Sequence, residues 1–178
     1  MALSRRLDPD RMAPLGVPVL MALASRDATV VPASAVRLFC RAAPPGRRKL
    51  LWYTLHRTVE EARSDLKDLG ADEACLADIE VRDRAATGAP ANILEFSHLS
   101  LPNRPDNPVY GAGHYRNCLS YYFADRALYD LCKERPPAEV VMGERGDTAG
   151  QAPVQRLTFN PDFDAMAERI GTFLAGTR

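Results

Sequence analysis

The apolar residues of the chain fall into short runs that alternate with amphipathic segments. The first run, Val17 to Ala24, is continuous, which is typical of a strand covered on both faces. Residues Ala33 to Ala43 then repeat apolar positions at helical spacing and stop at two prolines, so they predict a helix. A second apolar run, Lys49 to Leu55, predicts another strand. The strand, helix, strand order favours a parallel pair joined by a right-handed crossover.

The same pattern continues to the end of the chain. The further predicted elements are a helix over Thr58 to Gly70 capped by Thr58, a short strand over Ile79 to Arg82, a main strand over Asn92 to Phe96, a helix over Leu119 to Lys133, a loop over Pro136 to Gln155, and a terminal helix capped by Asn160 or Asp162 with Phe163, Met166, Ile170, Phe173 and Leu174 facing inward. This layout predicts an α/β fold with a mostly parallel sheet and flanking helices. The length of 178 residues fits one domain spanning positions 1–178.

Charge and hydropathy exclude two classes of partner. Lys and Arg together number 23, as do Asp and Glu, so no concentrated basic face is expected to bind nucleic acid. The longest apolar run is too short to span a bilayer, and the first residues carry charges where a signal peptide needs an apolar core. We therefore expect a cytoplasmic protein without a membrane span.

The four cysteines, Cys40, Cys75, Cys118 and Cys132, form no CxxC pair and show no regular spacing. Three of them lie in helical or apolar settings. This pattern predicts reduced and mostly buried thiols rather than disulfides or metal ligands. The three histidines form no HExxH motif, and no paired carboxylates accompany them, so no metal site or other cofactor is predicted.

Two residues that can carry acid and base chemistry each follow an apolar run. Asp27 comes after the run Val17 to Ala24, and His98 comes after Asn92 to Phe96. In parallel sheets functional side chains gather at the carboxyl ends of the strands. An imidazole that acts as a general base needs a carboxylate to fix its tautomer and to stabilise the imidazolium. Taken singly, Asp27 could simply cap a turn, and His98 could be a hydrogen-bonded structural residue.

The stretch "VPVLMALASRDATVVP" resembles the segment of α/β-hydrolases that carries the catalytic acid, and "SHLSLP" resembles the late loop that carries their catalytic histidine. The longer runs "SHLSLPNRPDNPVYGAGHYRNCLSYY" and "RLTFNPDFDAMAERIGTFL" are similar to the carboxyl-terminal part of serine-aminopeptidase-like or lysophospholipase-like hydrolases. The resemblance implies that Asp27 is the triad acid and His98 the base. It also implies a small-molecule ester, thioester or amide as the substrate.

The nucleophile of that family stands in a GxSxG elbow ahead of the acid and the histidine, and no GxSxG occurs in these 178 residues. The resemblance therefore implies a partial α/β-hydrolase fold that lacks the amino-terminal strands. Two hypotheses follow. The chain is the carboxyl-terminal, acid- and histidine-bearing part of a serine hydrolase, or it is a non-catalytic α/β module that binds a complementary chain. In either case the edge of the strand Val17 to Ala24 is expected to be open to self-association or to another chain.

The identity of the base stays open between two histidines. His56 lies 29 residues after Asp27, a spacing common in α/β-hydrolases, whereas the flanks of His98 match the family loop. His98 is preferred because His56 leads directly into a charged helix, and His114, in a glycine-rich loop, is the weakest candidate. The tyrosines that could line an entrance to the site are Tyr110, Tyr115, Tyr121 and Tyr122, although such residues more often pack a loop against the sheet.

Overall fold

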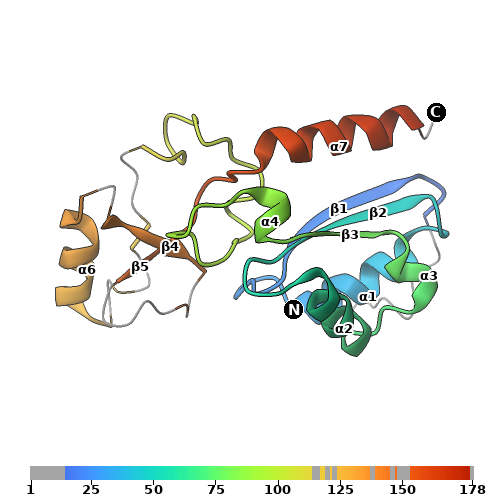
Figure 1. Cartoon of the computed structure of the whole chain (residues 1–178), viewed down its shortest axis with the longest axis horizontal. Helices are drawn as coiled ribbons and strands as arrows, with labels where there is room; N and C mark the ends of the chain where they lie inside the picture. Colours follow the sequence, from blue (N-terminus) through green and yellow to red (C-terminus); the bar gives the residue numbers. More distant parts are fainter. Residues whose placement is uncertain are drawn as a thin grey trace, which may run out of the picture.

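The computed structural model describes residues 15–113, 117–118, 121, 124–136, 139–144, 147 and 153–176. Its main sheet has three parallel strands in the order β1-β2-β3, namely β1 (Val19–Ala24), β2 (Arg48–Tyr53) and β3 (Ile79–Arg82) (Figure 1). The α/β class and the parallel pairing predicted from the pattern are confirmed. The α/β-hydrolase assignment stays a prediction.

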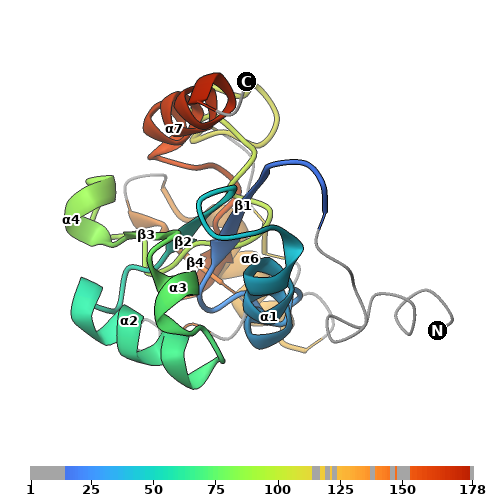
Figure 2. The ribbon, with the colours of Figure 1, turned by 90° about the vertical axis from the view of Figure 1, so that its right-hand side faces the viewer.

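Helices cover both faces of this sheet. Figure 2 shows α1 (Pro32–Ala42), α2 (Val59–Asp68) and α3 (Glu73–Leu76) on one face, and α7 (Phe163–Gly176) on the other. Successive side chains of a strand point to opposite faces, so Leu50 and Trp52 of β2 join the core beneath α1 and α2. Leu51 and Tyr53 join the second core, which includes Met166 of α7. Among the described residues, no helix combines the length and the hydropathy that a bilayer span requires.

The helices predicted over residues 33–43, over 58–70 and at the carboxyl end are confirmed as α1, α2 and α7, with one detail wrong. Thr58 caps α2, as predicted, and its side chain accepts the amide hydrogen of Glu61 as part of a complete capping box. Of the helix expected over Leu119 to Lys133, the structure describes α6 (Arg126–Glu134), which the carboxylate of Asp125 caps by accepting the amide hydrogen of Leu128. Most of residues 119–123 lie outside the described residues. In α7, Leu174 is 58% exposed rather than turned inward, since the face of this helix that joins the core carries Phe163, Met166 and Ile170.

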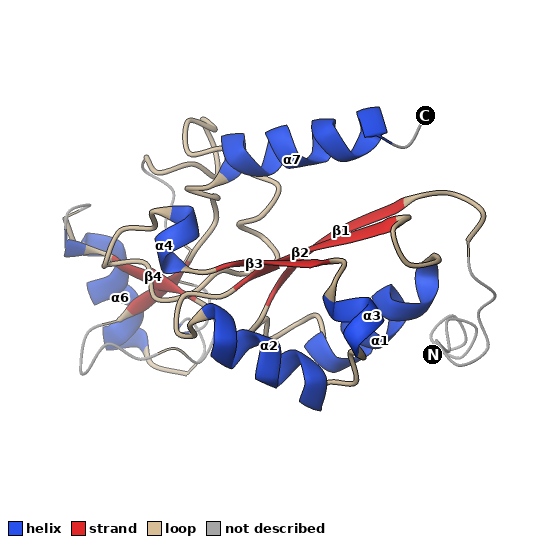
Figure 3. Ribbon diagram, turned by 45° about the vertical axis from the view of Figure 1, so that its right-hand side comes forward, coloured by secondary structure: helices blue, strands red, loops and turns tan. Residues whose placement is uncertain are grey.

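The region after β3 departs most from the expected layout. A short helix, α4 (Arg84–Thr87), follows β3, and the expected strand over residues 92–96 is reduced to one isolated parallel bridge between Ile93 and Met142. The ladder stops there because the amide of Phe96 donates to the carboxylate of Glu95 instead of to a neighbouring strand. The predicted loop over 136–155 holds β4 (Val141–Gly143), which pairs in parallel with β5 (Val154–Arg156), as Figure 3 shows in red for β4.

The prediction of reduced thiols is wrong, since all four cysteines are paired. Cys40 of α1 is bonded to Cys75 of α3, with their Cα atoms 5.4 Å apart, and Cys118 is bonded to Cys132 of α6 at 6.1 Å. The sequence spacing could not show this, because each pair joins two separate segments that meet only in the folded chain. Disulfides persist mainly in oxidising compartments, so these bonds do not support the expected cytoplasmic location.

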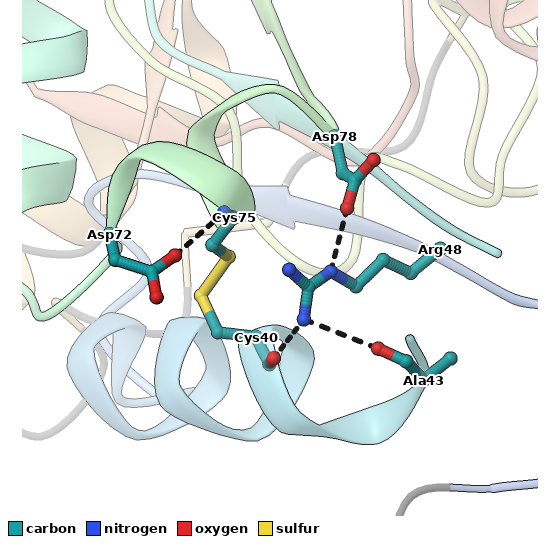
Figure 4. Close-up of a disulfide and its surroundings, with 6 residues drawn as sticks. All are labelled: Cys40, Ala43, Arg48, Asp72, Cys75 and Asp78. Atoms are coloured by element: carbon teal, nitrogen blue, oxygen red, sulfur yellow. Dashed lines mark hydrogen bonds and ion pairs between the residues drawn. A yellow bond between two sulfur atoms is a disulfide. The ribbon is translucent and has the colours of Figure 1, made fainter. Parts of the chain in front are cut away.

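A buried arginine lies beside the first disulfide (Figure 4). Arg48, at the start of β2, donates from Nε to the Asp78 carboxylate at 2.8 Å and from Nη1 to the carbonyl oxygens of Ala43, at 3.2 Å, and of Cys40. The guanidinium thus satisfies carbonyl groups at the end of α1 that have no partner within the helix. The disulfide and Arg48 together fix the carboxyl end of α1 against α3 and the start of β2.

Candidate active site

Asp27 follows β1 and closes a tight turn. Its Oδ1 accepts the amide hydrogens of Thr29 at 2.7 Å and Val30 at 2.8 Å. This is the turn-capping role that an aspartate commonly has after a strand. The other carboxylate oxygen, Oδ2, points to a segment more than 70 residues later in the chain, so the turn does not account for the whole side chain.

His98 lies against that second oxygen. Its Nδ1 is 2.8 Å from Oδ2 and 3.0 Å from Oδ1 of Asp27, and its backbone amide donates to Oδ2 at 2.6 Å. The predicted proximity of Asp27 and His98 is confirmed, although His98 lies in a loop and not at the end of a strand. Its catalytic role stays a prediction.

Two buried serines hold the backbone around His98, and the sequence interpretation missed them. The Ser97 hydroxyl donates to the carbonyl oxygen of Leu157 at 2.7 Å, which ties the loop to the chain just after β5. The Ser100 hydroxyl donates to the carbonyl oxygen of Ser97 at 2.7 Å, and the Ser97 amide donates back to the Ser100 hydroxyl at 3.1 Å. This reciprocal turn, SxxS in the sequence, fixes the direction of the His98 side chain.

The surroundings of Asp27 favour its ionised form. Burial alone would raise the pKa of its carboxyl, which is 7% exposed. The amides of Val30 and Thr29, the nearby His98 charge and the His98 amide outweigh burial and lower the pKa of Asp27 below its ordinary value. The carboxylate is therefore charged at neutral pH, as a partner of an imidazolium must be.

The alternative base, His56, has a different carboxylate partner. Its Nδ1 lies 2.5 Å from Oε2 of Glu95, which is 1% exposed and also accepts the amide hydrogens of Leu55 and Phe96. Burial raises the pKa of Glu95, against the opposing effect of these hydrogen bonds. Since Glu95 and His98 are three residues apart, the segment 95–98 contributes one residue to the His56–Glu95 pair and one to the His98–Asp27 pair.

The remaining candidates contribute less to the site. Tyr121 accepts the amide hydrogen of Val154 with its hydroxyl at 2.8 Å, which is a packing role, and Tyr110 is 45% exposed. His114, Tyr115 and Tyr122 lie outside the described residues.

An apolar cavity of about 310 Å³ adjoins Asp27 and His98. It lies between β1 and α7, and its walls are formed by Ala22, Leu23, Ala24, Val30, Leu101, Met166 and Ile170, among others. A pocket of this size that is mostly apolar, with a carboxylate and an imidazole at its boundary, matches the general form of small-molecule sites. The pair thus has an apolar cavity beside it.

A third ionisable group, which the sequence interpretation did not single out, completes this cluster. Glu144 directly follows β4, and one of its carboxylate oxygens lies within 4.8 Å of ligand atoms of both Asp27 and His98. Three such groups could hold a metal ion, but Glu144 Oε1 already accepts from two nitrogens of Arg156 and Asp27 already accepts from three amides. The sequence signal was present, because an acid follows the apolar run "VVMG" as Asp27 follows β1.

Comparison of the chain with protein-family models, with curated proteins and with solved structures gave no match. The resemblance to α/β-hydrolases therefore stays a prediction that depends on the residues of this chain alone.

Proposed function

We propose that Asp27 and His98 are the acid and the base of a serine hydrolase that cleaves an ester, a thioester or an amide. The observation that carries this proposal is the contact of His98 Nδ1 with an ionised and almost fully buried Asp27 at 2.8 Å. With Nδ1 held by the carboxylate, Nε2 is the ring nitrogen that exchanges protons with the reacting groups.

The chemistry follows the acyl-enzyme route. His98 Nε2 takes the proton of a serine hydroxyl as the serine oxygen bonds to the substrate carbonyl carbon. The imidazolium then gives that proton to the leaving group as the bond between the leaving group and the carbonyl carbon breaks. Water attacks the acyl-enzyme through the same two proton transfers, which releases the carboxylic acid and the free serine. Asp27 stabilises the imidazolium throughout. The apolar cavity between β1 and α7 would hold the acyl chain.

The serine in this proposal belongs to a GxSxG segment that is not among these 178 residues. Two of the described serines, Ser97 and Ser100, are fully buried and donate their hydroxyl hydrogens to backbone carbonyls. Those hydroxyls shape the loop and are not available to attack a substrate. The proposed partner segment would place its nucleophile near His98 Nε2.

The second candidate function is a non-catalytic module that binds a complementary chain. It is favoured by the position of β1, which pairs with β2 on one side and has no strand on its other side within the described part of the chain. An unpaired edge can accept a further strand from a partner. In that case Asp27 and His98 would only close the turn and fix the loop.

Fluorophosphonate labelling separates the two functions. The chain is produced together with the product of the coding sequence directly upstream in its genome, and serine labelling is followed by mass spectrometry. We expect labelling at one GxSxG serine of the upstream product and none on the chain produced alone. The His98→Gln variant should lose at least about 100-fold in labelling rate, as expected for loss of a general base.

The matched control is His56→Gln, which removes the other carboxylate-bound imidazole and should label at nearly the wild-type rate. Labelling that survives His98→Gln but is lost in His56→Gln would reverse the assignment of the base. An upstream product without a GxSxG serine, or a complex without labelling, would favour the binding module. Labelling of a serine within this chain would contradict the proposal directly.

A further inference from the structure

The loop that carries Asp27 is fastened to the small sheet of β4 and β5. Arg156, the last residue of β5, donates from Nη2 to the hydroxyl of Thr29 at 3.3 Å. On the other side of the loop, Arg26 lies 3.5 Å from the carboxylate of Asp147, which also accepts the amide hydrogen of Glu144 at 2.7 Å. Charged residues from the ends of both strands thus surround the turn that positions Asp27.

Glu144 occupies the centre of this arrangement. Its side chain is 1% exposed, and its Oε1 lies 2.7 Å from both Nε and Nη2 of Arg156. Two charge-assisted contacts to one cation hold this buried carboxylate in a defined position. The Glu144 carboxylate also lies within 4.8 Å of ligand atoms of His98 and Asp27, so two acids approach one imidazole.

We propose that Glu144 is a positioning residue that acts through His98, as a second carboxylate that stabilises the protonated imidazole beside Asp27. The proposal deepens the hydrolase function above and rests on it for the catalytic consequence, but the electrostatic effect on His98 does not depend on a nucleophile. Arg156 moderates the effect by neutralising part of the Glu144 charge, and it keeps the carboxylate next to the loop of Asp27.

The charges near His98 allow the sign of the effect to be worked out. The described ionisable groups nearest to His98 by these contacts are Asp27 and Glu144, followed by Arg156, Asp147 and Arg26. The pair of His56 and Glu95 lies at the other end of the segment 95–98. Removal of the Glu144 charge leaves Arg156 without its counterion beside the loop. Both changes disfavour a positive charge on His98.

The test is a titration of the His98 ring by NMR, in the presence of EDTA, for the wild type and for Glu144→Gln. Glutamine keeps the shape and one acceptor oxygen for Arg156, so the fold should persist. We expect the pH at which half of the His98 rings are protonated to fall by about one unit, a roughly tenfold change, as expected for a unit charge at this distance in a partly solvated site. An unchanged or higher midpoint would overturn the proposal.

Two controls sharpen the result. Glu80→Gln removes the carboxylate charge that pairs with Lys49, Arg82 and Arg169 near the amino-terminal ends of β2 and β3, and it should leave the His98 midpoint unchanged. The double variant Glu144→Gln with Arg156→Gln removes both charges, so its shift should be smaller than that of Glu144→Gln alone. A shift of equal size in Glu80→Gln would mean that the effect is not local, which also contradicts the proposal.

If the Glu144→Gln variant does not fold, a measurement on the wild-type protein tests the same contact. The ¹³C shift of the Glu144 carboxyl in the wild type should show a step at the His98 midpoint, and the step should vanish in His98→Gln. Its absence would overturn the proposal. Stoichiometric binding of added Zn²⁺ with loss of the His98 signal would also overturn it, because Glu144, Asp27 and His98 would then be ligands. Each of these outcomes can be measured even if the fluorophosphonate labelling fails.

Discussion

Asp27→Asn tests how much the acid contributes to the fold, separately from any catalysis. Asparagine can still accept the amide hydrogens of Thr29 and Val30 with its one carbonyl oxygen. In place of Oδ2 it presents an amide group that carries hydrogens, which faces the amide of His98 now bonded at 2.6 Å. A donor therefore meets a donor, and the His98 amide loses its partner.

The magnitude follows from the bonds that are lost. A hydrogen bond to a charged group contributes about 1.5 to 3 kcal/mol, and a buried donor left unsatisfied costs about 1 to 3 kcal/mol. These effects overlap at one atom, so we expect Asp27→Asn to lower the free energy of unfolding by about 2 to 4 kcal/mol at pH 7. Urea denaturation followed by the fluorescence of Trp52, the single tryptophan and 2% exposed, measures this change.

The difference should depend on pH in a defined direction. The pKa of Asp27 is lowered in the folded protein below its ordinary value of 3.8, so its stabilising contribution is complete above that value. It is lost as the pH falls through the lower, folded pKa. The gap between wild type and Asp27→Asn should therefore be full at neutral pH and shrink only below about pH 4.

The control for this experiment is Asp106→Asn. The Asp106 side chain is 72% exposed and pairs with Arg104 at 3.0 Å, and an ion pair exposed in this way contributes little to stability. If Asp27→Asn is no more destabilising than Asp106→Asn, or if its effect grows on acidification, the bonds to Asp27 Oδ2 do not support the loop of His98 as described.

Two further predictions concern the sheet edge and the disulfides. The purified chain should self-associate at micromolar concentration in the ultracentrifuge. The Met21→Lys variant should associate less, because it places a charge on the edge strand β1. A concentration-independent monomer would contradict the prediction that the edge of β1 is open. Replacing Cys40 and Cys75 with serine should lower the free energy of unfolding by about 4 kcal/mol, because their bond closes a loop with a sequence separation of 35. If urea denaturation shows an effect below about 1 kcal/mol, this bond adds little to stability.

Periodicity predicted the elements whose pattern is local. The strands β1, β2 and β3 and the helices α1, α2 and α7 lie where the apolar spacing placed them, because each buries one stripe or both faces against the same sheet. The segment 92–96 shows the limit of this logic. It has the apolar content of a strand, but the Glu95 carboxylate takes the amide hydrogen that a ladder would use.

The site was predictable only in part, for a related reason. Asp27 and His98 each follow an apolar run, which is why the sequence indicated them, although only the run before Asp27 forms a strand. Glu144 follows the apolar run of β4 in the same manner, but this strand has only three residues and lies in a segment that was predicted as a loop. The pairing of His56 with Glu95 depends on contact across 39 residues, and no local pattern reports such a contact.

The contacts of the four residues from Glu95 to His98 determine when the conformational entropy of this segment is lost. Both ends of this segment are fixed by carboxylate and imidazole contacts, to His56 at one end and to Asp27 at the other. The backbone entropy of ordering it, about 1 to 2 kcal/mol per residue, is therefore lost when the chain folds and not when a substrate arrives. A base held in this way is preorganised, so binding energy from a substrate need not be spent on orienting the ring.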